Sequence, residues 1–370
     1  MARIAALGTS VPRNRLTQSD AALAVAESLR LSSRKSAALH DLFERADVDS
    51  RFCVLNSVAL KDKRSLSETM QLYRVHAERL SLQAARDCLK VADISPEQID
   101  LIITCSCTGM LLPSLSLLIA RELGLRGDVR RMPITEAGCS GGAYSLARAA
   151  DYVRAFPRAR VLVIAVELPS LTLQKDDPSN SNLVACALFG DGAAAVVIEG
   201  SDVETSTGNA VLEIVDTHTQ LFPDSLGDLG FDLRDGGLHI VLSRFVPEIV
   251  SQNAPKTIER FLTRSGLSKE DLSFFVLHPG GRKILDALSA SLLLERESTQ
   301  ISRDVLRTYG NQSSASVLFV LEQTLAQKST GGYGLLAAFG PGITMELCLL
   351  HRTLAEAPNA VVSAERGLAS

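Results

Sequence analysis

The stretch Gly138–Val153, GCSGGAYSLARAADYV, decides the fold of this chain because the sequence contains a second version of it. The second version is Gly310–Leu325, GNQSSASVLFVLEQTL, which begins about 170 residues further on. Each stretch opens with glycine and other small residues and continues with the apolar spacing of a helix. One duplication with so long a period predicts two related half-domains, not a solenoid of short repeats.

The segments around the two stretches repeat in the same order. Asp100–Gly109 and Asp271–Gly281 precede them, and Ala159–Glu167 and Tyr333–Gly342 follow them. All four contain short apolar runs bounded by glycine, proline or charged residues, which is typical of buried strands in an α/β protein. The sequence therefore predicts a strand, a helix and a strand in the same order in each half.

The division of the chain follows from this duplication. We predict an N-terminal half over residues 1–208 and a C-terminal half over residues 209–370, joined by the polar segment 200–212. The segment 221–237 is rich in glycine and aspartate and predicts a loop or an insertion. Pro255 lies inside a segment with helical spacing and predicts a kink or a restart of that helix.

The composition is that of a soluble globular protein. Of the 370 residues, 46% are hydrophobic and 22% are charged, and the formal net charge of -4 provides no basic field for nucleic acid. No run of residues is apolar enough to span a membrane, and the N-terminus lacks the features of a secretory signal. The seven cysteines lack a disulfide-framework spacing, which predicts reduced thiols and a cytoplasmic protein.

Three reactive side chains stand out because each is flanked by glycine or other small residues. Cys139 opens a predicted helix, whose N-terminus favours a thiolate, although many free cysteines are simply buried in packing corners. His278 ends an apolar strand, where active sites of α/β proteins usually lie, although a structural histidine also fits there. Asn311 occupies the duplicate of the Cys139 position, and its alternative role is a helix N-cap.

The duplication links these three side chains. Two turns related by a pseudo-twofold axis would place Cys139 and Asn311 on opposite sides of one cavity, and His278 arrives on the strand before the second turn. A thiol that carries an acyl group, an imidazole that activates it and an amide that stabilises an oxyanion suit covalent acyl chemistry. Cys105 and Cys107 lack a second cysteine pair or a nearby histidine, so no metal site is predicted.

Five motifs mark a resemblance to a known family: GCSGG, ALFGDGAAAVV, LHPGG, YGNQSSASVLFVLE and FGPG. In these motifs the chain resembles type III polyketide synthases, the chalcone synthase-like group of the thiolase superfamily. The resemblance covers most of the chain and implies a thiolase-like five-layered αβαβα fold from two duplicated half-domains. It also implies a homodimer, a buried cavity reached by the pantetheine arm of coenzyme A, an acyl-CoA starter and malonyl-CoA as substrates, and no metal or organic cofactor.

The resemblance carries roles to individual positions. Cys139 matches the family nucleophile, His278 its catalytic histidine and Asn311 its catalytic asparagine. Phe189 matches the gatekeeper between the coenzyme A tunnel and the cavity, and Arg51 matches a coenzyme A phosphate contact whose flanking lysines are missing here. The other positions matched to the cavity wall are Cys107, Thr108, Glu167, Thr172, Phe231, Ile240, Ser313, Phe339, Gly340 and Pro341.

Three of these positions depart from the plant pattern. Cys107 falls where plant members carry threonine, Phe231 where they keep a small residue, and Ile240 where they have a second gatekeeper phenylalanine. The changes resemble the bacterial branch of the family and argue against a plant chalcone or stilbene as product.

The resemblance implies a reaction sequence. Cys139, paired with His278, takes the starter acyl group from coenzyme A as a thioester. His278 and Asn311 stabilise the enolate that malonyl-CoA forms on losing CO2, the enolate extends the chain by Claisen condensation, and the product cyclises. The resemblance leaves two kinds of starter as alternatives. A fatty acyl starter would give an alkylpyrone or alkylresorcinol, and a short starter would give a small phenolic ring.

Other functions share parts of this pattern. A ketoacyl-ACP synthase III-like enzyme would use the same three residues with acyl carrier protein, but it favours an HQAN-like motif where this chain has HPGG. A degradative thiolase would need a second cysteine in the loop AFGPG. A Cys-His-Asn hydrolase shares the residue types but not the duplicated halves, and a non-catalytic binding protein would be favoured only by the loss of one of the three.

Overall fold

The computed structural model describes residues 1–204, 211–327 and 331–354. The predicted boundary between residues 208 and 209 lies outside the described residues, as do residues 205–210 of the predicted linker 200–212. In the described part of the chain, no helix is both long enough and apolar enough to cross a lipid bilayer.

A mixed sheet of nine strands forms the framework, in the spatial order β11-β12-β13-β8-β1-β7-β6-β4-β5. Its strands are β1 (Ala2–Ser10), β4 (Leu101–Cys105), β5 (Arg130–Ile134), β6 (Arg160–Glu167), β7 (Gly192–Gly200), β8 (Val211–Leu221), β11 (Leu272–Leu277), β12 (Gly332–Gly340) and β13 (Thr344–Thr353). Strands β1 and β8 pair at the centre of the sheet. On one side, the pairs β1–β7 and β7–β6 are antiparallel and the pair β6–β4 is parallel. On the other side, the pairs β8–β13 and β13–β12 are antiparallel and the pair β12–β11 is parallel. The strand directions therefore confirm the duplicated pattern that the sequence predicts.

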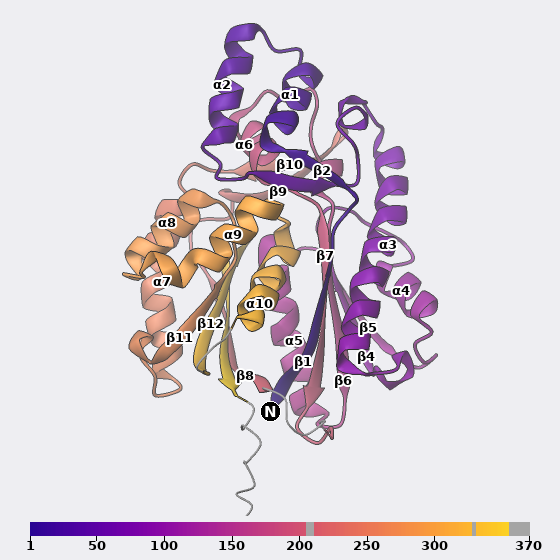
Figure 1. Ribbon diagram of the computed structural model, residues 1–370, viewed down its shortest axis with the longest axis vertical. Helices are drawn as coiled ribbons and strands as arrows, with labels where there is room; N and C mark the ends of the chain where they lie inside the picture. Colours follow the sequence, from indigo (N-terminus) through magenta and orange to yellow (C-terminus); the bar gives the residue numbers. More distant parts are fainter. Residues whose placement is uncertain (205–210, 328–330, 355–370) are drawn as a thin grey trace, which may run out of the picture.

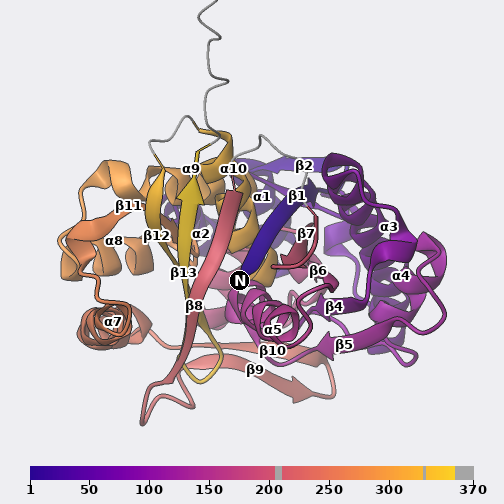
Figure 2. The ribbon, with the colours of Figure 1, turned by 90° about the horizontal axis from the view of Figure 1, so that it is seen from below.

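Helices and sheet form five layers, which Figures 1 and 2 show from two directions. The helices are α1 (Gln18–Ser28), α2 (Ser33–Glu44), α3 (Leu66–Ala92), α4 (Leu115–Leu123), α5 (Gly141–Ala155), α6 (Asn180–Leu188), α7 (Val246–Thr263), α8 (Arg282–Ser291), α9 (Gln300–Tyr309) and α10 (Ser316–Ala326). Helices α5 and α10 lie between the two halves of the sheet, α3 and α4 cover the outer face of one half, and α7 and α8 cover the other (Figures 1 and 2). Three clusters of buried apolar side chains fill the spaces between these layers. The predicted αβαβα fold is confirmed.

Small residues let the two central helices approach closely at their N-termini. A Cβ atom on Gly142 would lie 2.3 Å from the carbonyl oxygen of Ser314, and a Cβ atom on Gly141 would lie 2.3 Å from Cys105 Sγ. Any larger side chain at these positions would push α5 away from α10 and from β4. The glycines of the GCSGG motif are therefore required for packing, and this packing holds the two duplicated turns together.

A cap over one end of the layers contains α1, α2 and α6 with two small strand pairs (Figure 1). The pairs are β2 (Asn14–Thr17) with β3 (Ser50–Cys53), and β9 (Leu229–Arg234) with β10 (Gly237–Leu242). Of the predicted loop or insertion over 221–237, the loop is wrong for residues 229–234, because β9 forms there and pairs Phe231 with Ile240. Glycine and aspartate obscured the strand alternation that this pairing needs.

Pro255 does not make α7 restart, because the helix is continuous from Val246 to Thr263. The face that α7 buries includes Val250, Ala254 and Ile258. Apolar burial on both sides of the proline offsets the backbone hydrogen bond that it cannot donate. The predicted restart is therefore wrong, since packing outweighs local propensity here.

Candidate active site

Cys139 lies in the single 3-10 turn Gly138–Ser140 that leads into α5. Gly138 has φ +50, and a Cβ atom there would lie 2.6 Å from Cδ of Pro341. Glycine is therefore needed at this position both for its backbone conformation and for the contact with Pro341. The half-buried Cys139 thiol sits at the helix start that the sequence predicts.

Asn311 begins the corresponding turn of the C-terminal half and faces the thiol. Its backbone N–H donates to the carbonyl of Leu188 over 2.8 Å, and its carbonyl accepts from Gly190 N–H over 3.1 Å, which places it beside Phe189. Its side-chain Oδ1 accepts from Ser313 N–H over 2.8 Å and so caps the turn Ser313–Ala315, although Gln312 and not Asn311 occupies the N-cap position of that turn. The amide nitrogen Nδ2 lies 4.0 Å from Cys139 Sγ and donates to Gly280 O over 3.2 Å. One amide group therefore caps a turn and points its nitrogen at the thiol.

His278 directly follows β11, and its backbone N–H donates to Ala337 O over 2.9 Å. The ring is buried, and neither Nδ1 nor Nε2 has a hydrogen-bond partner among the described residues. A Cβ atom on Gly280 would lie 3.5 Å from Nε2, so the ring packs against the same Gly280 whose carbonyl binds Asn311. Buried polar atoms are rarely left unsatisfied, and both free ring nitrogens are consistent with a site built for a substrate.

Burial controls the protonation of the pair. Burial raises the pKa of Cys139 to about 11, while hydrogen bonds from Ser313 and Asn311 act in the opposite direction and the charge of Glu167 adds to the rise. Burial also lowers the pKa of His278 to about 3. Both groups are therefore neutral near pH 7, and the expected resting thiolate at the helix N-terminus is not supported, since desolvation outweighs the helix dipole.

A small cavity of about 30 Å³ lies against the thiol. Its walls come from both halves of the chain and from the β9–β10 hairpin. The lining residues are Cys107, Thr108, Gly138, Cys139, Pro169, Phe189, Leu229, Gly230, Phe231, Ile240, Ser313 and Pro341. The structure therefore brings seven of the matched positions other than Cys139 to one cavity. Four further residues line this cavity that the sequence resemblance did not indicate: Gly138, Pro169, Leu229 and Gly230. Each lies within two positions of a residue that the resemblance did match.

Glu167 lies behind this wall instead of in it. The buried carboxylate accepts hydrogen bonds from Thr108 Oγ1 over 2.8 Å, from Ser314 Oγ over 2.6 Å and from the backbone N–H of Cys107 over 3.1 Å. Burial raises its pKa, and these hydrogen bonds oppose the rise. Glu167 therefore orients Cys107 and Thr108, which do line the cavity.

Three other matched positions do not line the cavity. The hydroxyl of Thr172 donates to Pro169 O over 2.9 Å within its own turn. Phe339 is buried in the apolar cluster beneath α7 and α8. Gly340 packs on the Cys139 turn, because a Cβ atom there would lie 2.2 Å from Ser140 Oγ. Of the FGPG loop, only Pro341 lies among the cavity-lining residues.

Arg51 is buried, and its guanidinium binds the chain itself. It donates to the carbonyls of Cys186 over 2.6 Å, Ala187 over 2.8 Å and Phe189 over 3.0 Å, and to the side chain of Gln18. These bonds satisfy carbonyls at the C-terminal end of α6, which cannot be satisfied within the helix. Arg51 thus fixes the backbone at Phe189, and the expected contact with a coenzyme A phosphate is not supported.

A larger cavity of about 470 Å³ adjoins the site. Leu188 and Gly280 line it, so it begins beside Phe189 and beside the carbonyl that binds Asn311. The wall is mainly apolar, and four exposed basic residues also line it: Arg45, Arg244, Arg282 and Lys283. Arg282 and Lys283 directly follow LHPGG, so two adjacent cations after this motif are the signal in the sequence that indicates them.

Comparisons with known proteins agree with this geometry. The profiles of chalcone and stilbene synthases match residues 1–203 (N-terminal domain) and 213–354 (C-terminal domain). The chain is 35% identical over 350 residues to 1,3,6,8-tetrahydroxynaphthalene synthase of Streptomyces peucetius subsp. caesius, covering 94% of this chain and 92% of the relative. The solved structure of 1,3,6,8-tetrahydroxynaphthalene synthase from Streptomyces coelicolor A3(2) matches with TM-score 0.89 and 30% identity, covering 95% of this chain and 100% of that chain. The C-terminal type III polyketide synthase domain of Steely1 from Dictyostelium also matches with TM-score 0.89, at 26% identity over 95% of this chain and 99% of that one.

Five layers and two facing turns define a thiolase-like condensing enzyme. The chain belongs to the chalcone and stilbene synthase family, and it is a type III polyketide synthase, an enzyme of the acyltransferase class.

The pKa of Cys139 makes a direct prediction. Iodoacetamide should inactivate the free enzyme at a rate that keeps rising with pH towards about 11, because only the thiolate is the nucleophile. A rate that instead reached a plateau near neutral pH would show a resting thiolate–imidazolium pair. Mass spectrometry of the Cys139 peptide distinguishes its labelling from that of the other six cysteines.

Proposed function

We propose that the enzyme transfers an acyl group from an acyl-CoA starter to Cys139 and extends it with malonyl-CoA. The observation that carries this proposal is that the Asn311 nitrogen lies 4.0 Å from Cys139 Sγ and binds the carbonyl of Gly280. The buried His278 ring packs against the same Gly280 and has no hydrogen-bond partner among the described side chains. Neutral His278 accepts the thiol proton as sulfur attacks the thioester carbonyl. It then returns that proton to the departing coenzyme A sulfur.

The same groups serve the second substrate. The bond between the carboxylate and the α-carbon of malonyl-CoA breaks, CO2 leaves, and the electron pair becomes an enolate. Asn311 has two amide hydrogens, of which one binds Gly280 O and the other is available to the enolate oxygen, with His278 as second donor. The enolate carbon attacks the Cys139 thioester, a C–C bond forms, and the sulfur leaves and takes up a proton.

The mainly apolar cavity of about 470 Å³ suits the pantetheine arm, and its four cations suit the phosphates of coenzyme A. Phe189 lines the Cys139 cavity and its chain neighbour Leu188 lines the larger one, which supports a role of Phe189 as gatekeeper between them.

The size of the Cys139 cavity favours a short starter. Its volume of about 30 Å³ leaves no room for a long alkyl chain, and Phe231 and Ile240, which pair across the hairpin, both line it. We therefore favour a small phenolic product over an alkylpyrone or alkylresorcinol. The name of the tetrahydroxynaphthalene synthase relative agrees with this choice.

We further propose a cytoplasmic homodimer. All seven cysteines are free thiols, which suits a reducing compartment. Leu112 is 92% exposed and Met110 65% exposed in the loop before α4, near the sheet edge formed by β5. Exposed apolar side chains beside an open strand edge are typical of a surface that a second copy covers.

Removal of the nucleophile separates the two half-reactions. Cys139→Ala should abolish the acyl-enzyme mass adduct and all elongation, while decarboxylation of malonyl-CoA continues through His278 and Asn311. Asn311→Ala should slow that decarboxylation by about 10²–10³-fold, because an oxyanion donor is lost. Asn253→Ala on α7 is the matched control. Elongation by the Cys139→Ala variant would disprove the mechanism.

Removal of channel cations should weaken binding of coenzyme A thioesters specifically. Arg244→Ala and Arg282→Ala should each raise KM for acyl-CoA by about twofold to fivefold with kcat retained, as expected for a solvated ion pair. KM for N-acetylcysteamine thioesters, which lack the phosphates, should not change. Arg86→Ala on the exposed face of α3 is the control, and equal effects on both thioester types would exclude phosphate binding.

A charge in the exposed apolar loop should weaken the dimer. Leu112→Asp should shift the mass measured by light scattering from dimer to monomer, because a charge is costly inside an apolar interface. Leu293→Asp, at a residue that is 82% exposed after α8, should leave the mass unchanged. A wild-type enzyme that is monomeric at micromolar concentration would refute the dimer.

A further inference from the structure

A second, polar cavity of about 250 Å³ lies behind one wall of the Cys139 cavity. Neighbouring residues of the chain face the two spaces. Pro169 and Ile240 line the Cys139 cavity, whereas Ser170 and His239 line the polar one. The partition between them therefore consists of one tight turn and strand β10, and a small movement of β10 would lengthen the Cys139 cavity.

The partition stands apart from the main sheet. Strands β9 and β10 pair with each other and form a separate two-stranded sheet. At the open end of this hairpin, Leu229 O accepts from Gly342 N–H over 2.8 Å, and Leu242 O accepts from Ser181 Oγ over 3.1 Å. A two-stranded hairpin is only marginally stable alone, so contacts near its turn decide where Ile240 lies.

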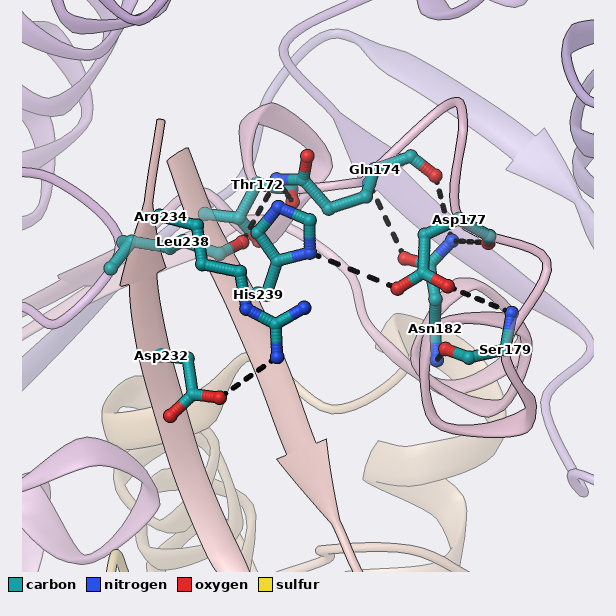
Figure 3. A network of polar contacts seen from close by, with 9 residues as sticks. All are labelled: Thr172, Gln174, Asp177, Ser179, Asn182, Asp232, Arg234, Leu238 and His239. Atoms are coloured by element: carbon teal, nitrogen blue, oxygen red, sulfur yellow. Dashed lines mark hydrogen bonds and ion pairs between the residues drawn. The ribbon is translucent and has the colours of Figure 1, made fainter. Parts of the chain in front are cut away.

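Polar contacts near the turn come from the loop before α6 (Figure 3). Gln174 Nε2 donates to Leu238 O over 2.9 Å and to Thr172 O over 3.0 Å. Nδ1 of His239 lies 3.8 Å from Oδ2 of Asp177, and both side chains are largely screened from solvent. These contacts flank Ile240 on its own strand and hold that strand against the turn that carries Pro169.

The loop that makes these contacts is itself anchored. Asn182 is buried on α6, and its Nδ2 donates to Gln174 O over 2.7 Å and to Asp177 O over 2.7 Å. Asp177 Oδ1 also accepts from Ser179 N–H over 2.9 Å. The hairpin is thus tied to α6, whose C-cap residue is Phe189, so one network positions two different walls of the cavity.

We propose that Gln174 is a positioning residue that, together with the Asp177–His239 pair, holds β10 against the Cys139 cavity and thereby sets the length of starter that the enzyme accepts. This inference rests on the proposed function. A single neutral hydrogen bond and one 3.8 Å contact between a ring nitrogen and a carboxylate oxygen stabilise the closed position, and each contributes little. Loss of one contact therefore lets Phe231 and Ile240 move towards the polar cavity without unfolding the hairpin, whose other end stays bonded.

The test compares Gln174→Met, which keeps the side-chain length and removes the donor, with wild type over a series from acetyl-CoA to dodecanoyl-CoA. The ratio of kcat/KM for dodecanoyl-CoA to that for acetyl-CoA should rise by about threefold to tenfold, as expected for one hydrogen bond. KM for malonyl-CoA and the decarboxylation rate should not change. His239→Asn should shift the ratio in the same direction.

The matched control is Gln83→Met on α3, where Gln83 donates to Asp87 over 2.8 Å on the solvent face. Its starter profile should equal that of wild type. Hydrogen exchange of the backbone amides of residues 229–242 gives a readout without catalysis, and exchange should be faster in Gln174→Met at an unchanged melting temperature.

These readouts separate two kinds of failure. If wild type elongates no acyl-CoA, the proposed function is wrong. If hydrogen exchange of residues 229–242 is also unchanged in Gln174→Met, the positioning role of Gln174 is overturned as well. Suppose instead that wild type elongates acyl-CoA while folded Gln174→Met shows the same ratio of kcat/KM for dodecanoyl-CoA to acetyl-CoA and the same hydrogen exchange. In that case only the positioning role of Gln174 is overturned. An equal shift in Gln83→Met would likewise overturn it.

Discussion

The contact between the N-termini of α5 and α10 is the constraint on which the site depends. Gly142 leaves no room for a Cβ atom against Ser314 O, so the two duplicated turns meet at backbone distance. This contact brings the Cys139 thiol from one half within 4.0 Å of the Asn311 amide from the other. The segment directly after β11 supplies both His278 and the Gly280 carbonyl that orients the amide. Cys139 and Asn311, which lie far apart in the chain, thus come together because the residues beside them are small.

Burial gives this site its chemical character. Desolvation raises the pKa of Cys139 and lowers that of His278, so the resting pair carries no charge. A neutral imidazole can accept the thiol proton during acylation and can donate a hydrogen bond to an enolate afterwards, whereas an imidazolium could do only the second. Low polarity around the donors also strengthens their interaction with a developing oxyanion. The same desolvation that makes the thiol unreactive at rest therefore favours the condensation step.

Much of this architecture was predictable from sequence, and the failures share one cause. The duplicated turns at Cys139 and Asn311 are recognisable because their small residues are dictated by packing. Matching positions to a family gives a place in the chain but not a side-chain direction, so Thr172 turned back on its own loop and Arg51 turned inward to cap α6. The cations of the larger cavity come from separate elements, so their proximity exists only after folding. The thiolate expectation failed because a helix N-terminus is visible in sequence and the degree of burial is not.

The division of reactive groups between the two halves has a consequence for how the enzyme comes into being. The nucleophile precedes its partners Asn311 and His278 by more than a hundred residues of chain. During synthesis, the first half emerges from the ribosome with the Cys139 thiol but without the His278 imidazole and the Asn311 amide. In the proposed mechanism, acyl transfer to Cys139 therefore waits until the second half has been made and has docked. The same mechanism gives a truncated chain no acyl transfer, so that activity would report complete assembly.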